Sequence, residues 1–162
     1  RFDILLVDNA FERVIAAYAN NLKKLGITVD YRSIDASLYT DRVKNFDFDM
    51  LVSTFPQSQS PGNEQRDYWS SQAAEQPGSR NLAGIRSPVV DALIEAIIYA
   101  DTQEKLTTAC RALDRVLWYG YYVVPNWYLA SHRLAYASWL RQPETLPLYF
   151  SADQWLDTWW RE

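Results

Sequence analysis

The chain has 162 residues, of which 48% are hydrophobic and 22% charged, and its formal net charge at pH 7 is −4. This length suits one domain or one lobe with a real hydrophobic core, and the composition is typical of a folded globular protein. The acidic balance gives no attraction to a phosphate backbone, so nucleic acid is not an expected partner.

The first third of the chain predicts three strands separated by two helices. Apolar residues run almost unbroken in the first strand, as in strands covered on both faces, and recur at helical spacing in the first helix, which ends at Gly26. The predicted elements are a strand at 2–7, a helix at 10–25, a strand at 27–34, a helix at about 37–44 and a strand at 48–52. This order predicts an α/β fold with a mostly parallel sheet, whose ligands bind beyond the carboxyl ends of the strands.

The stretch 53–85 follows the third predicted strand and carries no sustained apolar period. Connections of this length are uncommon in compact domains unless they bind something or are disordered, and aromatic residues such as Tyr68 argue against disorder. Its polar residues mix donors, acceptors and both charges. We therefore expect a ligand-facing segment on a rigid scaffold, with these residues nearest the ligand: Gln57, Asn63, Glu64, Arg66, Asp67, Trp69 and Asn81.

Two helices are predicted after this segment, because Ser87 with Pro88 and then Thr102 are good helix starts. Cys110 falls on the apolar stripe of the second helix, which favours a small buried side chain over a reactive thiol. The stretch 121–129 is rich in β-forming residues, and Pro125 in its middle indicates an edge or bent strand.

The predicted lobe covers 1–138, and 139–162 is an aromatic-rich tail. Its residues Trp155, Trp159 and Trp160 are expected to pack onto the lobe or onto a missing neighbour. The first ten residues lack the features of a signal peptide and predict a strand entered midway, so we expect a piece of a longer protein.

Few residues offer metal or covalent chemistry. Cys110 is the only cysteine, so no intramolecular disulfide is possible, and with the single His132 a zinc site would need several carboxylates. His132 lies in a polar context without a nucleophile motif, which favours a hydrogen-bonded or exposed histidine. The glycines form no phosphate-binding pattern. No metal or cofactor is expected.

Three alternatives concern the residues of 53–85. Glu64 and Asp67 have the spacing of an acid/base pair, which would suit a hydrolase, although two carboxylates on one turn are common on polar surfaces. Arg66 suits either an ordinary ion pair or a forked donor for a ligand carboxylate or phosphate. Tyr68 and Trp69 either anchor the segment to the core or stack against a ligand, and the sequence does not separate the two roles.

A family resemblance is carried by four stretches of the sequence. In chain order they are DFDMLVS, SPGNEQRDYW, PGSRNLAGI and ALDRVLWYGYYVVPNWY. From residue 2 to about 139 the chain resembles the family 5 extracellular solute-binding proteins of ABC transporters, most closely the YejA-type oligopeptide-binding branch. The resemblance implies a lobe of a periplasmic protein about three times this size. Such a protein closes two lobes round an oligopeptide or peptide-like ligand and delivers it to a membrane permease, so the missing amino-terminal lobe is an expected partner.

The chain departs from the pattern of better-known peptide binders in this family. They carry an Asp that pairs with the amino terminus of the peptide, where this chain aligns Gln57, with Pro61 at the following proline. The amino terminus of a peptide ligand is then expected to pair with Glu64, Asp67 or the other lobe. The alternative is that the ligand has no free amine. A carbohydrate-binding lobe with Trp69, Trp127 and Tyr128 as stacking platforms is the main rival, because the same architecture serves sugars.

Overall fold

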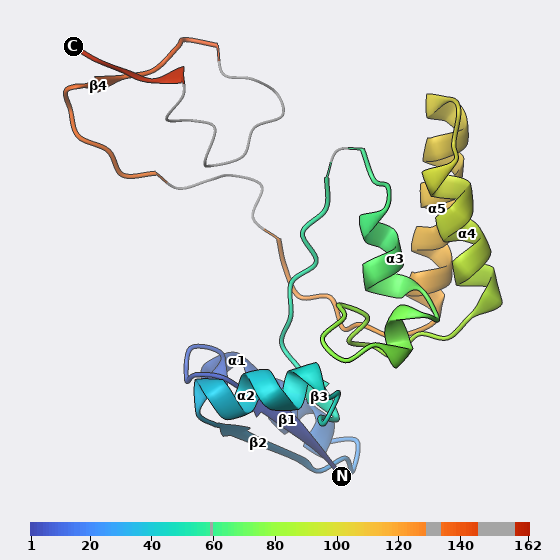
Figure 1. Ribbon diagram of the computed structural model, residues 1–162. Helices are drawn as coiled ribbons and strands as arrows, with labels where there is room; N and C mark the ends of the chain where they lie inside the picture. The colour runs from blue at the N-terminus through green and yellow to red at the C-terminus, as the bar shows by residue number, and fades with distance from the viewer. Residues whose placement is uncertain (59, 129–133, 146–157) are drawn as a thin grey trace. The chain divides into compact units, whose positions relative to one another are not determined.

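The structure is a computed structural model that describes residues 1–58, 60–128, 134–145 and 158–162 (Figure 1). His132 and Trp155, for which the sequence predicts roles, lie outside the described residues. The chain divides into two compact units, Arg1–Val123 and Val124–Glu162. The expected division into a lobe at 1–138 and an aromatic-rich tail at 139–162 stays a prediction.

The first unit contains the predicted parallel sheet. β1 (Phe2–Leu6) lies between β2 (Val29–Ser33) and β3 (Met50–Leu51) and pairs parallel with both. Within β1, Ile4 and Leu6 pack against Ile15, whereas Leu5, which is also buried, points to the opposite face because side chains alternate along a strand. Both faces of the central strand are therefore covered, as its continuous apolar sequence predicts.

Two helices connect these strands. α1 (Glu12–Lys23) joins β1 to β2, and α2 (Ala36–Lys44) joins β2 to β3. The two crossovers run in opposite directions across the sheet, so the right-handed rule places the helices on opposite faces and produces three layers. Gly26 has a φ of 78°, the left-handed conformation expected after the first helix. The α/β architecture with a parallel sheet is confirmed.

The strands are shorter than the sequence predicts. The third covers two residues where five were expected, and 121–128 forms no strand, so that prediction is wrong for the described part of 121–129. A β-rich sequence becomes a strand only when it has a partner for its backbone groups. A short antiparallel pair is present further along the chain, between β4 (Leu140–Arg141) and β5 (Trp160–Arg161).

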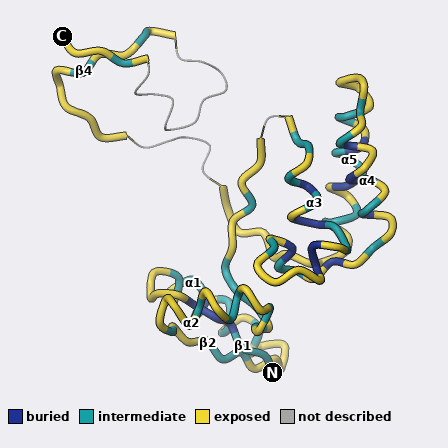
Figure 2. Tube along the Cα trace, in the orientation of Figure 1, coloured by how far each residue is buried: buried dark blue, intermediate teal, exposed yellow. Residues whose placement is uncertain are grey.

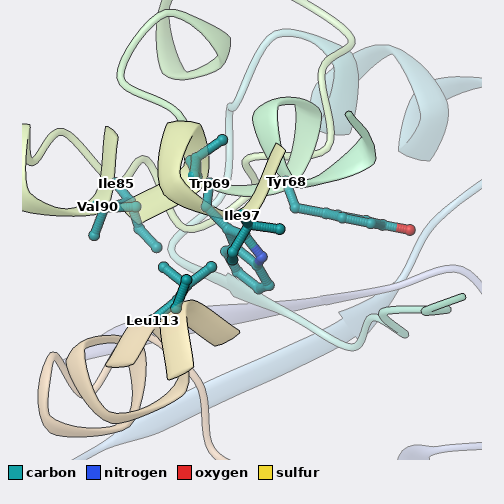
Figure 3. Packing of buried hydrophobic residues seen from close by; sticks show 8 residues of the cluster. Tyr68, Trp69, Ile85, Val90, Ile97 and Leu113 are labelled. Carbon is teal, nitrogen blue, oxygen red and sulfur yellow. The ribbon is translucent and has the colours of Figure 1, made fainter. Parts of the chain in front are cut away.

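The second half of the first unit is organised round a helical hairpin. α4 (Pro88–Ile98) begins at Ser87 and α5 (Gln103–Tyr119) at Thr102, and both capping hydroxyls accept a backbone N–H as predicted. The core of this half is drawn in Figure 3 and includes Ile94 and Leu113, one from each helix. Cys110 packs against the same cluster, and burial raises the pKa of its thiol, which agrees with an unreactive apolar role.

Among the described residues, no helix is long and apolar enough to cross a membrane.

The hairpin core makes a prediction about stability. Ile94 is 1% exposed, and replacing it with Ala removes apolar contacts that its surroundings refill only in part. We expect Ile94→Ala to lower the free energy of unfolding by about 2–5 kcal/mol, measured by chemical denaturation. Leu38→Ala, at a site on α2 that is 51% exposed, is the control and should cost much less. Equal losses for the two variants would contradict the assigned core.

Candidate functional site

The segment 53–85 contains regular structure that its sequence does not reveal. α3 (Glu64–Trp69) and the 3-10 helix η1 (Ala73–Glu75) lie inside it. Both are too short to show an apolar period, which needs several turns to become visible. In α3 the buried residues are Gln65, Tyr68 and Trp69, one face of a single helical turn, and Figure 2 shows buried positions along this segment.

An aromatic cluster attaches the segment to the hairpin core. The ring centroid of Phe55 lies 4.9 Å from that of Trp69 and 6.0 Å from that of Tyr68. Figure 3 shows Trp69 among Ile85, Val90, Ile97 and Leu113. Trp69 is only 7% exposed, so in this structure it anchors the segment and offers no open face for stacking on a ligand.

Asn81 holds the far end of the segment. It is fully buried, its amide nitrogen donates to the carbonyl oxygens of Ser70 and Ile85 at 2.9 Å each, and its amide oxygen accepts from the backbone N–H of Ile85 at 3.0 Å. These bonds close the turn that carries Gly84 in the left-handed conformation, with a φ of 63°. Asn81 thus shapes the segment from inside.

Glu64 and Gln57 meet around Gln65. One carboxylate oxygen of Glu64 accepts from the backbone N–H of Gly62 at 3.0 Å, and from Ser58 and Gln65 at 3.3 Å each. Burial alone would raise the pKa of Glu64, but the bonds from backbone N–H groups, Gln65 and Ser58 outweigh it, so this pKa lies below its usual value. No cationic partner of Glu64 is found in the described part of the chain.

Arg66 lies on the other flank of α3 and is engaged with α4. Its guanidinium donates to both carboxylate oxygens of Glu95, at 2.9 and 2.7 Å, and to the amide oxygen of Asn63 at 3.0 Å. The bond to Glu95 is the main cause that raises the pKa of Arg66, and it lowers the pKa of Glu95 in return. Of the two roles open to Arg66, the ion pair is the one present here.

Asp67 belongs to a third contact. Its carboxylate lies 3.7 Å from the guanidinium of Arg80 and accepts from the backbone N–H of the same residue at 3.4 Å. Arg80 also donates to the hydroxyl of Tyr68 at 2.8 Å, and this hydroxyl donates to the carbonyl of Pro56 at 3.0 Å. The contact ties three parts of the segment together.

The structure therefore separates the residues predicted for the site into groups. Gln57 and Glu64 come together, Asn63 joins Arg66, and Asp67 pairs with Arg80, while Trp69 and Asn81 are interior. Glu64 and Asp67 make contacts with different residues, and a carboxyl with a lowered pKa does not suit a general acid. Among the described residues, no three His, Cys, Asp or Glu gather in a way that could hold a metal ion.

Three residues at the centre of these contacts were not predicted as site residues: Gln65, Arg80 and Glu95. Gln65 and Trp69 have the i, i+4 spacing of facing side chains, which would have paired them once α3 was recognised. Arg80 lies 13 positions from its partner Asp67, and Glu95 lies 29 positions from its partner Arg66. Only the fold brings such pairs together.

Sequence relatives match this chain over nearly its whole length. It is 44% identical over 158 residues to the probable peptide-binding protein YejA of Agrobacterium fabrum, a match that covers 98% of this chain and 25% of that protein. It is 35% identical to the peptidoglycan-binding protein YepA of the same organism, again over 98% of this chain and 25% of the relative. The chain thus spans about a quarter of the length of these relatives. No family model matches.

A solved structure has the same fold. It is the periplasmic oligopeptide-binding protein of an oligopeptide ABC transporter from Thermotoga maritima, with mannohexaose bound. The two structures superpose with a TM-score of 0.59 at 20% sequence identity, over 72% of this chain and 23% of that one. At this identity the likeness concerns the fold alone: most of this chain folds like part of that binding protein.

Asn81 provides a test of how the segment is held. Asn81→Ala would leave the buried carbonyl and the buried N–H of Ile85 without their partner, at roughly 1–3 kcal/mol for each group that finds no water, whereas the carbonyl of Ser70 keeps its bond from the N–H of Ala74. We expect the free energy of unfolding to fall by at least about 2 kcal/mol in denaturant titrations. Gln76→Ala, at an exposed position of the same segment, should change it little. A tolerated Asn81→Ala would show that the segment is held in another way.

Glu64 predicts an acid-dependent component of stability. The pKa of Glu64 in the folded chain lies below its ordinary value, so its hydrogen bonds stabilise the fold above that ordinary value and are lost as the pH falls through the lowered pKa. Melting temperatures measured from pH 7 down to pH 3 should therefore fall more steeply for the unchanged protein than for Glu64→Gln. Parallel curves for the two proteins would contradict this assignment.

Proposed function

We propose that this chain, which matches about a quarter of the length of the probable peptide-binding protein YejA, is the ligand-contacting lobe of the substrate-binding component of an ABC importer. The whole protein would bind an oligopeptide or peptide-like compound in a cleft between two lobes, in the periplasm, and deliver it to the membrane permease. The names of the relatives, a peptide-binding and a peptidoglycan-binding protein, support this ligand class.

The observation that carries the proposal is the construction of 53–85. It leaves the sheet after β3 and returns to the core through α4, and its interior is held by aromatic packing and buried hydrogen bonds. A loop so heavily anchored presents its outer polar groups in constant positions, which is what recognition of a ligand requires. Loops that follow strands of a parallel sheet are also where ligands of such folds bind.

Within this segment we assign ligand contact to Gln57 and Glu64 first, because they retain unused hydrogen-bonding capacity at the surface. Asn63, Arg66 and Asp67 remain candidates whose present partners a ligand would have to displace. Trp69 and Asn81 support the site from the interior.

Exposed aromatic residues support the presence of a further part of the protein. At the end of α5 and just after it, large side chains face outward, and exposed apolar surface of this kind commonly marks an interface. The most exposed are Trp118, at 62%, Tyr119, at 70%, and Tyr121, at 83%. We assign this surface to contact with the remaining three quarters of the longer protein, including the amino-terminal lobe.

A carbohydrate ligand is the second candidate, because the related fold in Thermotoga maritima is described with bound mannohexaose. Trp69 cannot serve as its stacking platform while buried, whereas Trp127 is 59% exposed and Tyr128 is 85% exposed. A hydrolase has less support, because Glu64 and Asp67 are bound to different partners.

The full-length protein purified without denaturation tests the proposal. Native mass spectrometry should show a bound peptide or peptide-like compound, and calorimetry should show binding of a tetra-alanine peptide but not of mannohexaose, with no cleavage product. Glu64→Gln should weaken peptide binding by about 1–3 kcal/mol if the carboxylate pairs with a buried ligand group. Glu104→Gln, on the exposed side of α5, is the matched control. Binding of the sugar alone, or release of alanine, would replace the proposal with one of its rivals.

A further inference from the structure

We propose that Gln65 is a positioning residue that turns the side-chain NH₂ of Gln57 outward, so that the ligand group met at Gln57 is a hydrogen-bond acceptor oxygen. This inference rests on the proposed function and narrows its ligand class at one point of the site. It follows from the direction of a chain of hydrogen bonds through Trp69, Gln65 and Gln57.

The direction is set at the buried end of the chain. The indole N–H of Trp69 lies 3.1 Å from the amide oxygen of Gln65, and an indole nitrogen can only donate. The two ends of a glutamine amide are distinguished by such partners. The end of Gln65 that faces Trp69 must therefore be its oxygen, and the NH₂ group must point the other way.

Glu64 imposes the same orientation independently. Its carboxylate oxygen lies 3.3 Å from the amide nitrogen of Gln65 and accepts from the backbone N–H of Gly62 at 3.0 Å, and an ionised carboxylate can only accept. A flipped Gln65 would set its oxygen against the carboxylate and lose both bonds. Gln65 is 4% exposed, so water is a poor substitute for either partner.

Gln57 receives this orientation. Its amide oxygen accepts from the NH₂ of Gln65 at 2.6 Å, which leaves the NH₂ of Gln57 facing away from Gln65. Gln57 is exposed, and no partner of its NH₂ is found among the residues that the structure describes. The site thus presents a neutral donor whose direction is set from the core.

A neutral donor selects its ligand group by chemistry. It matches a carbonyl or carboxylate oxygen, and it repels no anion, but it cannot bind an ammonium group, which is also only a donor. Ligands of the proposed class carry carbonyl oxygens along their whole length. The position of Gln57 therefore contacts an amide or carboxylate oxygen of the ligand, and an amine must be bound elsewhere.

Two substitutions at Gln57 test whether this residue presents a hydrogen-bond donor to the ligand. Both are made in the full-length protein, with tetra-alanine as the probe. Gln57→Leu removes the donor and should weaken binding by about three- to tenfold. Gln57→Glu still accepts from Gln65 but presents an acceptor outward, so we expect a loss of about tenfold or more. Gln76→Glu adds the same charge at an exposed position of the segment and should change the affinity less than twofold. Tighter or unchanged binding by Gln57→Glu would overturn the proposal.

The positioning role of Gln65 requires a readout that a purely structural role would not alter. Gln65→Met keeps the volume and removes both hydrogen-bonding ends. In this background Gln57 has no preferred direction, so adding Gln57→Leu should cost less than twofold in affinity, compared with the larger loss in the unchanged protein. The same loss in both backgrounds would show that Gln65 does not orient Gln57. Melting curves identify a variant that does not fold, and the Gln57 variants alone still test the polarity.

The hydrogen bonds are also tested without a ligand. In NMR spectra the side-chain NH₂ protons of Gln57 should exchange rapidly with water, and those of Gln65 slowly, with a hydrogen-bonded indole N–H of Trp69. Protected NH₂ protons on Gln57 would overturn the proposal whatever the ligand. If the NMR result is as expected but tetra-alanine does not bind the unchanged protein, the peptide class of the proposed function fails, while the orientation of Gln57 stands.

Discussion

A buried indole N–H must find an acceptor, and the way Trp69 meets this requirement organises the candidate site. The ring is part of the hairpin core, so its N–H lies where water cannot serve as a partner. Gln65, four residues earlier on α3, supplies the acceptor. The same amide then has an NH₂ group to satisfy, and it does so with Gln57 and Glu64. Packing inside the lobe thereby determines that the Gln57 amide turns its hydrogen-bond donor, and not its acceptor, toward the surface.

The parts of the fold that follow periodic sequence could be predicted. The buried first strand, both capped helices of the hairpin and the turn at Gly26 each have a local cause that is written in neighbouring residues. α3 could not be predicted, because a helix of fewer than two turns shows no apolar period in its sequence. The stretch 121–128 has strand-forming residues, but it forms no strand because its backbone groups have no neighbouring strand to pair with.

The candidate site shows the same division between local and distant causes. Its location after the third strand follows from element order, and its polar residues are evident in composition. Which of them face a ligand depends on partners such as Glu95 for Arg66, and the sequence does not indicate that pairing. Trp69 and Asn81 looked available because burial of a residue inside a long irregular segment has no local signature.

The charges of this segment are largely neutralised within the lobe, and this has a consequence for selectivity. Arg66 pairs with Glu95, Arg80 with Asp67 and Arg86 with Glu75, so three guanidinium groups already have carboxylate partners. A ligand that used one of them would have to compete with an existing ion pair, although such exposed pairs are weak. A neutral amide with an unused donor has no such competitor and loses little hydration on binding. Recognition through Gln57 would therefore depend on backbone-like oxygens, which many ligands share, more than on the charge of any one of them. This selectivity suits the peptide ligands proposed above, because their backbone oxygens recur whatever their side chains are.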